Sequence, residues 1–192
     1  MIKLPNGISD YVRLVEDGYY YVDKTMYIEK LENLSAPYIM FLRPRKFGKT
    51  LFTSVLENYY DILKKDKFEK LFSNTYIGKH PTGLQNTYHI LKFNFSGIDT
   101  ENEETTMQGF KDNVEIAINS FVQKYNIDFI INSKQTPEAM LISLFEAFKL
   151  QKTEEKIYVI IDEYDHFANE LLGFKTDEFK NLVAKNGKIQ NV

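Results

Sequence analysis

The chain of 192 residues contains no cysteine, which excludes disulfide bonds and every cysteine-ligated zinc site. It has no internal repeat and no low-complexity segment, and its start, MIKLPNGISDYV, lacks the apolar run of a signal peptide. No stretch approaches the roughly 18 to 20 consecutive apolar residues that a membrane-spanning helix needs. We therefore expect a soluble, cytoplasmic protein with no membrane partner.

Excess charge of either sign is missing as well. The formal net charge is -3 and the isoelectric point is about 5.7, which gives no general argument for binding nucleic acid. Hydrophobic residues make up 43% of the chain, with 13 Tyr and 15 Phe, so the composition supports a folded core. We expect one domain over residues 1–192, with no second domain and no nucleic-acid partner for this domain alone.

Short apolar runs alternate with helical patterns along the chain, which indicates an α/β fold whose parallel sheet is flanked by helices. Continuous apolar runs of this length suit strands that are buried on both faces of a parallel sheet. Residues 1–18 read as a loop-rich arm, and residues 64–86 read as helical turns. The expected strands are 38–42, 88–95 and 157–161, and the expected helices are 26–34, 51–63, 104–125, 136–150 and 176–187.

The segment FLRPRKFGKT, residues 41–50, ends like a phosphate-binding P-loop. Gly48, Lys49 and Thr50 match the end of the G-x-x-x-x-G-K-[ST] pattern, although position 43 holds Arg where the pattern has Gly. An expected strand precedes the loop and an expected helix follows it, which is the order that a P-loop requires. The alternative is a chance GKT tripeptide.

Each residue type in this loop suits phosphate chemistry. Gly48 lets the backbone approach a phosphate without a Cβ atom, Lys49 neutralises phosphate oxygens, and the Thr50 hydroxyl can ligate Mg²⁺. Arginine and lysine side chains nearby add positive charge beside the expected phosphate; the alternative is that these side chains contact nucleic acid. Proline stiffens the turn. The expected nucleotide-binding residues are Arg43, Pro44, Arg45, Lys46, Phe47, Gly48, Lys49 and Thr50.

A second motif follows the last apolar run, where IYVII leads into Asp162 and Glu163. This is the form of a Walker B motif, in which Asp162 holds Mg²⁺ and Glu163 acts as the general base that orients water. Lys49 and Glu163 are the expected catalytic residues. The alternative is an ordinary strand that runs into an acidic helix cap.

Five segments taken together resemble the AAA-ATPase-like family of bacterial proteins: LPNGISDYVRL, YYYVDKT, FLRPRKFGKTLFTSVLENYY, LKFNFSGI and YVIIDEYDHFANELL. The resemblance implies a P-loop NTPase-like fold with ATP and Mg²⁺ as cofactors, usually followed by a PD-(D/E)XK nuclease-like domain. The family commonly has R-P-R-[RK]-F-G-K-[ST] at its loop, so Arg43 fits it. Tyr164, Asp165, Phe167 and Asn169 match a family pattern to which we assign no role.

One departure from related ATPases concerns the sheet. In those proteins a sensor strand follows the Walker B strand in sequence and lies between it and the P-loop strand, whereas here only about 30 residues follow Glu163 and they read as helix and tail. We therefore expect an incomplete ATPase module, truncated before the sensor strand, with low turnover and an exposed edge that favours self-association. The alternatives are a nucleotide-gated binding module without turnover and a silent truncated product.

Other residues carry weaker hypotheses. Asp23 and Lys24 precede the P-loop, where related ATPases place adenine contacts; a surface ion pair is the alternative. The run Tyr19–Tyr21 could stack on a base or form a half-buried strand surface. His80, His89 and His166 show no metal-ligand spacing, and we expect them to be solvated or core residues.

Overall fold

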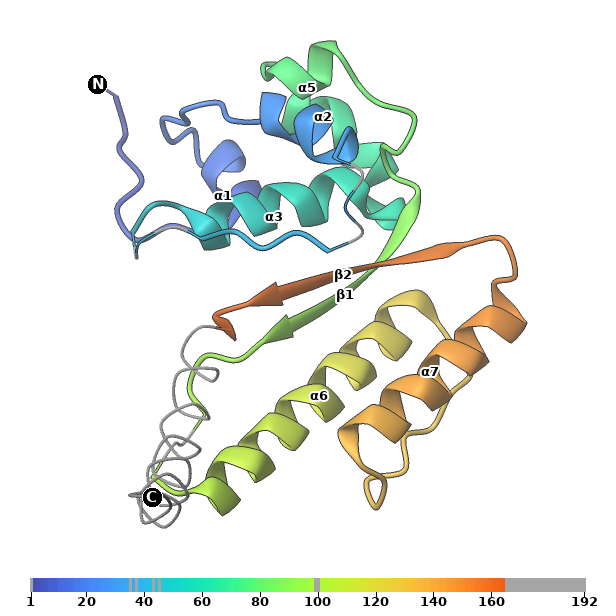
Figure 1. The fold of residues 1–192 in the computed structure, drawn as a ribbon. Helices are drawn as coiled ribbons and strands as arrows, with labels where there is room; N and C mark the ends of the chain where they lie inside the picture. Colours follow the sequence, from blue (N-terminus) through green and yellow to red (C-terminus); the bar gives the residue numbers. More distant parts are fainter. Residues whose placement is uncertain are drawn as a thin grey trace, which may run out of the picture. The chain divides into compact units, whose positions relative to one another are not determined.

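The computed structural model describes residues 2–34, 36, 38–42, 44, 46–98 and 101–164. The chain divides into two compact units. The first unit contains the described residues up to Leu91 together with Lys152–Ile160, and the second contains those of Lys92–Gln151 and those from Ile161 onward. Figure 1 shows the elements of both units in chain order by colour.

The described residues contain one two-stranded parallel sheet, formed by β1 (Tyr88–Asn94) and β2 (Lys156–Asp162) (Figure 1). Both strands contribute residues to both units. Parallel pairing needs a long connection between strands, and helices supply it here. The predicted strands 88–95 and 157–161 are confirmed, and a mixed α/β architecture with them.

The first unit is built around α3 (Lys49–Tyr60), which buries most of its length. The buried face carries the aromatic pair Tyr59 and Tyr60; the Tyr59 ring meets Phe72 edge-on at 5.7 Å, and the Tyr60 ring stacks on Tyr158 at 4.7 Å. Aromatic side chains thus fill a core that contains no tryptophan. The other helices of this unit are α1 (Tyr11–Glu16), α2 (Met26–Glu32), η1 (Ile62–Lys67), α4 (Phe68–Phe72) and α5 (Tyr76–Lys79).

Helix α1 corrects the prediction that residues 1–18 form only a loop-rich arm. Asp10 caps this helix by accepting a hydrogen bond from the Arg13 N–H at 2.8 Å. Tyr11 is fully buried, and its hydroxyl donates to the Leu71 carbonyl at 2.8 Å. Two turns of helix are too short for a clear apolar period, so tertiary contacts stabilise α1 rather than local pattern.

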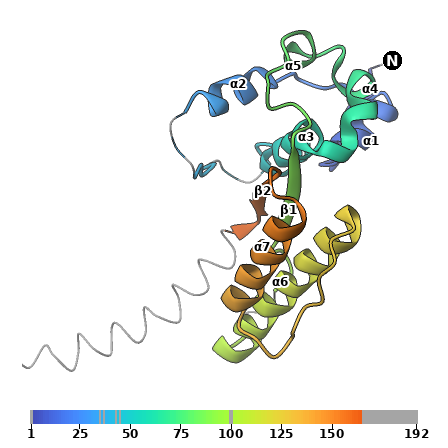
Figure 2. The same cartoon turned by 90° about the vertical axis from the view of Figure 1, so that its right-hand side faces the viewer.

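The second unit contains α6 (Glu103–Tyr125) and α7 (Pro137–Gln151), which lie side by side (Figures 1 and 2). Asn102 and Thr105 form a reciprocal capping box at the start of α6. Phe121 and Phe148 join the two helices with ring centroids 5.8 Å apart. Both predicted helices are confirmed, whereas the predicted helix 176–187 lies outside the described residues. No helix in the described part of the chain is long and apolar enough to cross a membrane.

The predicted strand 38–42 is wrong. No hydrogen bond joins its backbone to another described residue, and Tyr38, Met40 and Leu42 are 92%, 66% and 76% exposed. Phe41 is held by an edge-on contact with the Phe52 ring of α3 at 5.4 Å. The apolar pattern is that of a strand, but a strand also needs a neighbour to accept its hydrogen bonds, and no described strand lies beside this segment.

Candidate functional site

The GKT loop turns into α3 through two residues in the left-handed region. Lys46 has φ 68° and Gly48 has φ 78°, and Gly48 is the N-cap residue of the helix. The glycine requirement at position 48 comes from this φ angle, because a Cβ there would have no heavy atom within 4 Å. Left-handed residues in a tight turn direct backbone N–H groups toward one concavity, which is the geometry of an anion-binding nest.

The N-terminus of α3 has neither a capping side chain at its N-cap residue, Gly48, nor an acidic residue in its first turn. Lys49 and Thr50 occupy this turn and are partly buried, while Phe47 is 63% exposed and Pro44 is exposed. The N-terminal N–H groups of a helix and the helix dipole favour an anion at such a position. Arg43 and Arg45 lie outside the described residues.

Helix α3 holds the loop on a rigid base. Ser54, one turn further along the helix, accepts a hydrogen bond from the Tyr11 N–H at 2.9 Å. Val55 and Tyr59 on the same helix are fully buried in the core of the first unit. A site on the first turn of this helix is consequently positioned by an element whose other face belongs to the core of the unit.

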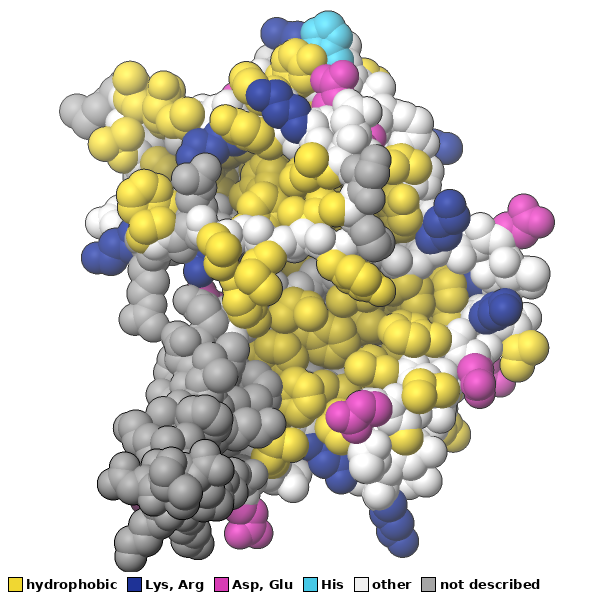
Figure 3. Space-filling model, in the orientation of Figure 1, with side chains coloured by type: hydrophobic (Ala, Val, Ile, Leu, Met, Phe, Trp, Pro, Cys, Tyr) yellow, Lys and Arg dark blue, Asp and Glu magenta, His cyan; other side chains and the backbone are white. Residues whose placement is uncertain are grey.

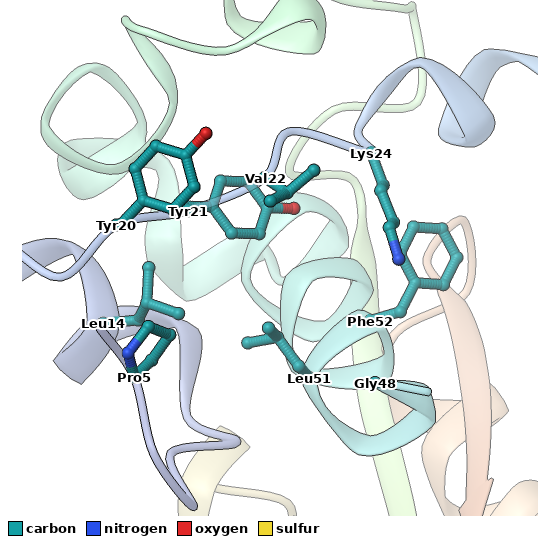
Figure 4. A pocket seen from close by; sticks show the side chains of 9 residues that line it. All are labelled: Pro5, Leu14, Tyr20, Tyr21, Val22, Lys24, Gly48, Leu51 and Phe52. Carbon is teal, nitrogen blue, oxygen red and sulfur yellow. The ribbon is translucent and has the colours of Figure 1, made fainter. Parts of the chain in front are cut away.

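A pocket of about 210 Å³ opens beside the loop (Figure 4). Gly48, Leu51 and Phe52 of α3 form one wall, and the segment Tyr20–Lys24 forms another. Lys24 reaches from this segment toward Phe52, and among the described residues that line the pocket it supplies the one charged side chain (Figure 4). The described lining is therefore mostly apolar, and it includes Gly48 of the GKT loop.

Asp23 holds this wall in place, a role that the sequence analysis missed. Its carboxylate accepts hydrogen bonds from the Thr25 N–H at 2.8 Å and from the Tyr76 N–H, the first of α5, at 2.6 Å. The next two N–H groups of α5 bond to the Thr25 hydroxyl, at 3.1 Å, and to the Thr75 hydroxyl, at 3.2 Å. The Asp-x-Thr pattern, which is typical of Asx turns, was the available signal.

Asp162 and Glu163 follow β2 directly. Asp162 is 5% exposed; its carbonyl accepts from the Phe95 N–H at 3.2 Å, and its Oδ1 accepts from the Glu163 N–H at 3.1 Å. Glu163 has φ 55°, which is rare for a residue with a side chain. Both acids belong to the second unit, whereas the GKT loop belongs to the first. The predicted site therefore has two halves, the GKT loop and the acidic pair, and each is described within its own unit.

Each half of the predicted site, taken by itself, carries an oxygen ligand of the kind that Mg²⁺ prefers. Thr50 offers a hydroxyl in one half, and Asp162 offers a carboxylate in the other. Within the described ranges no group of three His, Asp or Glu side chains could hold a metal ion by itself. With the described side chains alone, a metal at either half would therefore need further ligands, such as the oxygens of a phosphate.

His89 is a core residue, as predicted. Its side chain is 4% exposed, and its Nε2 lies 3.0 Å from Glu155 Oε2. Burial lowers the pKa of His89, and Glu155 partly offsets that effect by raising it. His80 is exposed, and His166 lies outside the described residues.

The fold and the loop together define an α/β protein in which a Gly-Lys-Thr turn begins the central helix of a compact unit. Residues 5–186 match the family described as "Predicted AAA-ATPase". The chain therefore belongs to this AAA-ATPase-like family, and the resemblance inferred from its motifs is confirmed.

A curated relative is similar over a shorter stretch. It is an uncharacterized protein in the vnfD 5' region of Azotobacter chroococcum mcd 1, 42% identical over 59 residues. The matched stretch covers 30% of this chain and 11% of that protein, so the chain spans only a small part of its relative. No solved structure matches the chain.

Proposed function

We propose that the chain is the nucleotide-binding module of a Mg²⁺-dependent ATPase, with the phosphates of ATP bound at residues 43–50. The observation that carries the proposal is the start of α3, where a left-handed Gly48 opens a helix with no capping side chain and no acid in its first turn. Family membership supports nucleotide binding generally. The local geometry supports a phosphate as the group that binds.

The proposed roles follow from the chemistry of each side chain. Lys49 neutralises charge on the phosphate oxygens, while Thr50 and Asp162 hold Mg²⁺. The metal, when bound, supplies further neutralisation of the phosphates. Glu163 orients the attacking water as general base. Arg43, Pro44, Arg45, Lys46 and Phe47 complete the loop around the anion.

We expect slow turnover, because the segment that enters the loop is not held in a sheet. Residues 38–42 make no backbone hydrogen bond to another described residue, and Leu42 at the entrance is 76% exposed. Displacements of about 1 Å between reacting groups can cost roughly a hundredfold in rate. The same observation favours a second candidate function, a module that binds nucleotide without turning it over.

The test is a calorimetric titration of Mg²⁺-ATP into the wild-type chain, Lys49→Ala and the control Lys65→Ala on the exposed side of η1. We expect Lys49→Ala to weaken binding by about tenfold or more, because a charge-assisted interaction is lost, and Lys65→Ala to leave it unchanged. Equal affinity of the wild type and Lys49→Ala would contradict the assignment. Phosphate release should be slower than about once per second, the low end for typical enzymes.

A further inference from the structure

We propose that Asn6 and Gly7 form a site at which the chain modifies itself. The main-chain nitrogen of Gly7 attacks Cγ of Asn6, which closes a succinimide ring and releases ammonia. Water then opens the ring at either of its carbonyl groups and leaves aspartate or isoaspartate at position 6. The site is separate from the phosphate loop, and its chemistry does not depend on the proposed function.

The reaction needs water alone as its second reactant. The bond that forms joins Gly7 N to Asn6 Cγ, and the bond that breaks joins Asn6 Cγ to its side-chain nitrogen. That nitrogen leaves as ammonia and carries the proton of the Gly7 N–H with it. Over the two steps an amide and a water molecule become a carboxylic acid and ammonia, so no oxidant or reductant takes part.

Gly7 leaves room for the ring to close. It has no side chain to hinder the approach of its own nitrogen, and a Cβ at this position would meet no heavy atom within 4 Å. Its φ of 72° belongs to a turn that glycine adopts without strain. The space around the peptide bond between Asn6 and Gly7 is consequently open to water and to movement of the Asn6 side chain.

Asn6 presents its amide to the Gly7 nitrogen without competition. Asn6 is exposed, and neither its side-chain amide nor the Gly7 N–H is hydrogen-bonded to another described residue. Its own N–H donates to the Leu4 carbonyl at 3.1 Å, which fixes the main chain on the other side of the residue. Reacting groups that are neighbours in one chain and free to meet react far faster than separate molecules do.

Other exposed asparagines of the chain are engaged. Asn94, Asn102 and Asn132 accept hydrogen bonds through Oδ1, at 2.9, 2.9 and 3.1 Å, from main-chain N–H groups two or three residues further on. Such local bonds hold the side-chain amide in one orientation. The fold therefore restrains these three asparagines and leaves Asn6 free to react.

The modification changes both charge and backbone at the start of the first unit. Either product adds one negative charge to a chain whose formal net charge is -3. Isoaspartate also lengthens the main chain by one atom, because the chain then runs through the Asn6 Cβ. The change falls next to Pro5, which lines the same pocket as Gly48 (Figure 4).

The added charge has a consequence that rests on the proposed function. Charges act on one another over about 10 Å at moderate ionic strength. A carboxylate beside Pro5 should therefore oppose an anion at the start of α3 and weaken binding of Mg²⁺-ATP by about twofold at low salt. The modification would then lower nucleotide affinity as the protein ages.

Peptide mapping of the aged full chain tests the site. Trypsin cleaves after Lys3 and Arg13, and the resulting peptide, LPNGISDYVR, contains Asn6 as its one amide residue. After incubation in mildly alkaline buffer at physiological temperature, we expect this peptide to gain the mass difference between an NH₂ and an OH group. Chromatography should resolve two products of this mass, aspartate and isoaspartate, and a sample taken at time zero corrects for reaction during digestion.

Asn74 is the matched control, because the tryptic peptide LFSNTYIGK contains it as its one amide residue. Asn74 is exposed like Asn6, but the nitrogen that follows it is engaged: the N–H of the buried Thr75 donates to the Phe72 carbonyl at 2.8 Å. We expect Asn6 to react at least about tenfold faster than Asn74, a barrier difference of about 1.4 kcal/mol. Asn6→Gln should gain no mass in the same time, because glutamine would have to form a larger ring.

The charge effect is tested separately by titrating Mg²⁺-ATP into the wild type, Asn6→Asp and Asn6→Gln. Asn6→Asp should bind about twofold more weakly at low salt and like the wild type at high salt, whereas Asn6→Gln should match the wild type at both.

Each outcome bears on one part of the inference. If Asn6 and Asn74 react at the same rate, or if a free peptide of residues 4–13 reacts while Asn6 in the folded chain does not, the site is overturned. A single product without isoaspartate overturns the succinimide route. If Asn6→Asp binds Mg²⁺-ATP like the wild type at low salt, the charge effect is overturned and the site stands. If no variant binds Mg²⁺-ATP, the proposed function fails together with the charge effect, and the mass measurement still decides the site.

Discussion

Two glycines show how differently single residues constrain this chain. Gly48 is required by its φ of 78°, although there is open space around a Cβ at that position. Gly78 in α5 has an ordinary φ, but a Cβ there would lie 1.8 Å from the Phe72 carbonyl oxygen of α4. The first glycine permits a backbone conformation, and the second permits two short helices to approach each other.

Gly78→Ala should therefore destabilise the first unit by roughly 1–3 kcal/mol, because backbone must move to admit the methyl group. Gly83→Ala is the matched control, since a Cβ at Gly83 meets nothing within 4 Å and its φ is not in the left-handed region. Urea unfolding followed by circular dichroism measures both. Equal stability of the two variants would show that the α4–α5 contact tolerates a side chain.

Glu163→Gln tests the proposed general base. The two side chains are nearly isosteric, so we expect nucleotide binding to persist while Lys49-dependent phosphate release falls by about a hundredfold or more. Single-turnover measurements with protein in excess over ATP give the rate, and Lys49→Ala gives the background. Glu154→Gln, on the exposed turn before β2, is the control. Unchanged release in Glu163→Gln would remove this residue from the mechanism.

At the scale of elements, β1 is tied to the turn that precedes β2 by His89 and Glu155, 3.0 Å apart. Burial lowers the pKa of His89 in the folded state below its ordinary value of 6.5, and Lys152 lowers it further, whereas Glu155 and Asp61 raise it. A lowered pKa means that the unfolded chain takes up a proton first as the pH falls. Stability is therefore full above about pH 6.5 and declines below it.

The predicted result is that the free energy of unfolding falls between about pH 7.5 and about pH 5.5, and that His89→Gln reduces this fall. Urea titrations at the two pH values measure it. His80→Gln, which removes an exposed histidine, should retain the wild-type dependence. An equal fall in His89→Gln and the wild type would show that other groups cause the pH dependence.

The elements also show where prediction from sequence succeeds. The pattern over 104–125 predicted α6 almost to the residue, because Asn102 caps it locally and its apolar period is long. Thr136 likewise caps α7, with its hydroxyl 3.4 Å from the Ala139 N–H. In contrast, the sequence pattern missed α1 and assigned residues 38–42 to a strand. Both segments take their conformation from contacts, made or missing, with residues distant in the sequence.

At the scale of the whole chain, the unpaired segment 38–42 is a candidate site of self-association. Its side chains Tyr38, Met40 and Leu42 are exposed, and Figure 3 shows hydrophobic side chains along the course that the segment follows below α3. An extended apolar segment with free backbone groups invites pairing with another chain. Self-association, which is expected from the sequence, remains a prediction, and residues 38–42 are the surface at which we expect it.

Met40→Lys should reduce concentration-dependent association, because a charge on the exposed face of this segment opposes strand pairing. Sedimentation velocity over a range of protein concentrations measures the change. Met107→Lys on α6, where the methionine is 47% exposed, is the control and should associate like the wild type. If both variants associate as strongly as the wild type, the segment is not the contact.

The sequence by itself determined the features whose causes are local. A glycine, a lysine and a threonine before an apolar period specify the start of α3, and an apolar run that ends in two acids specifies the end of β2. Only the tertiary structure decided that residues 38–42 stay unpaired, that Asp23 caps α5, and that Pro5, Tyr20 and Phe52 line one pocket. The physical reason is that these features depend on groups distant in sequence, whose hydrogen bonds and packing form only when the chain brings them together.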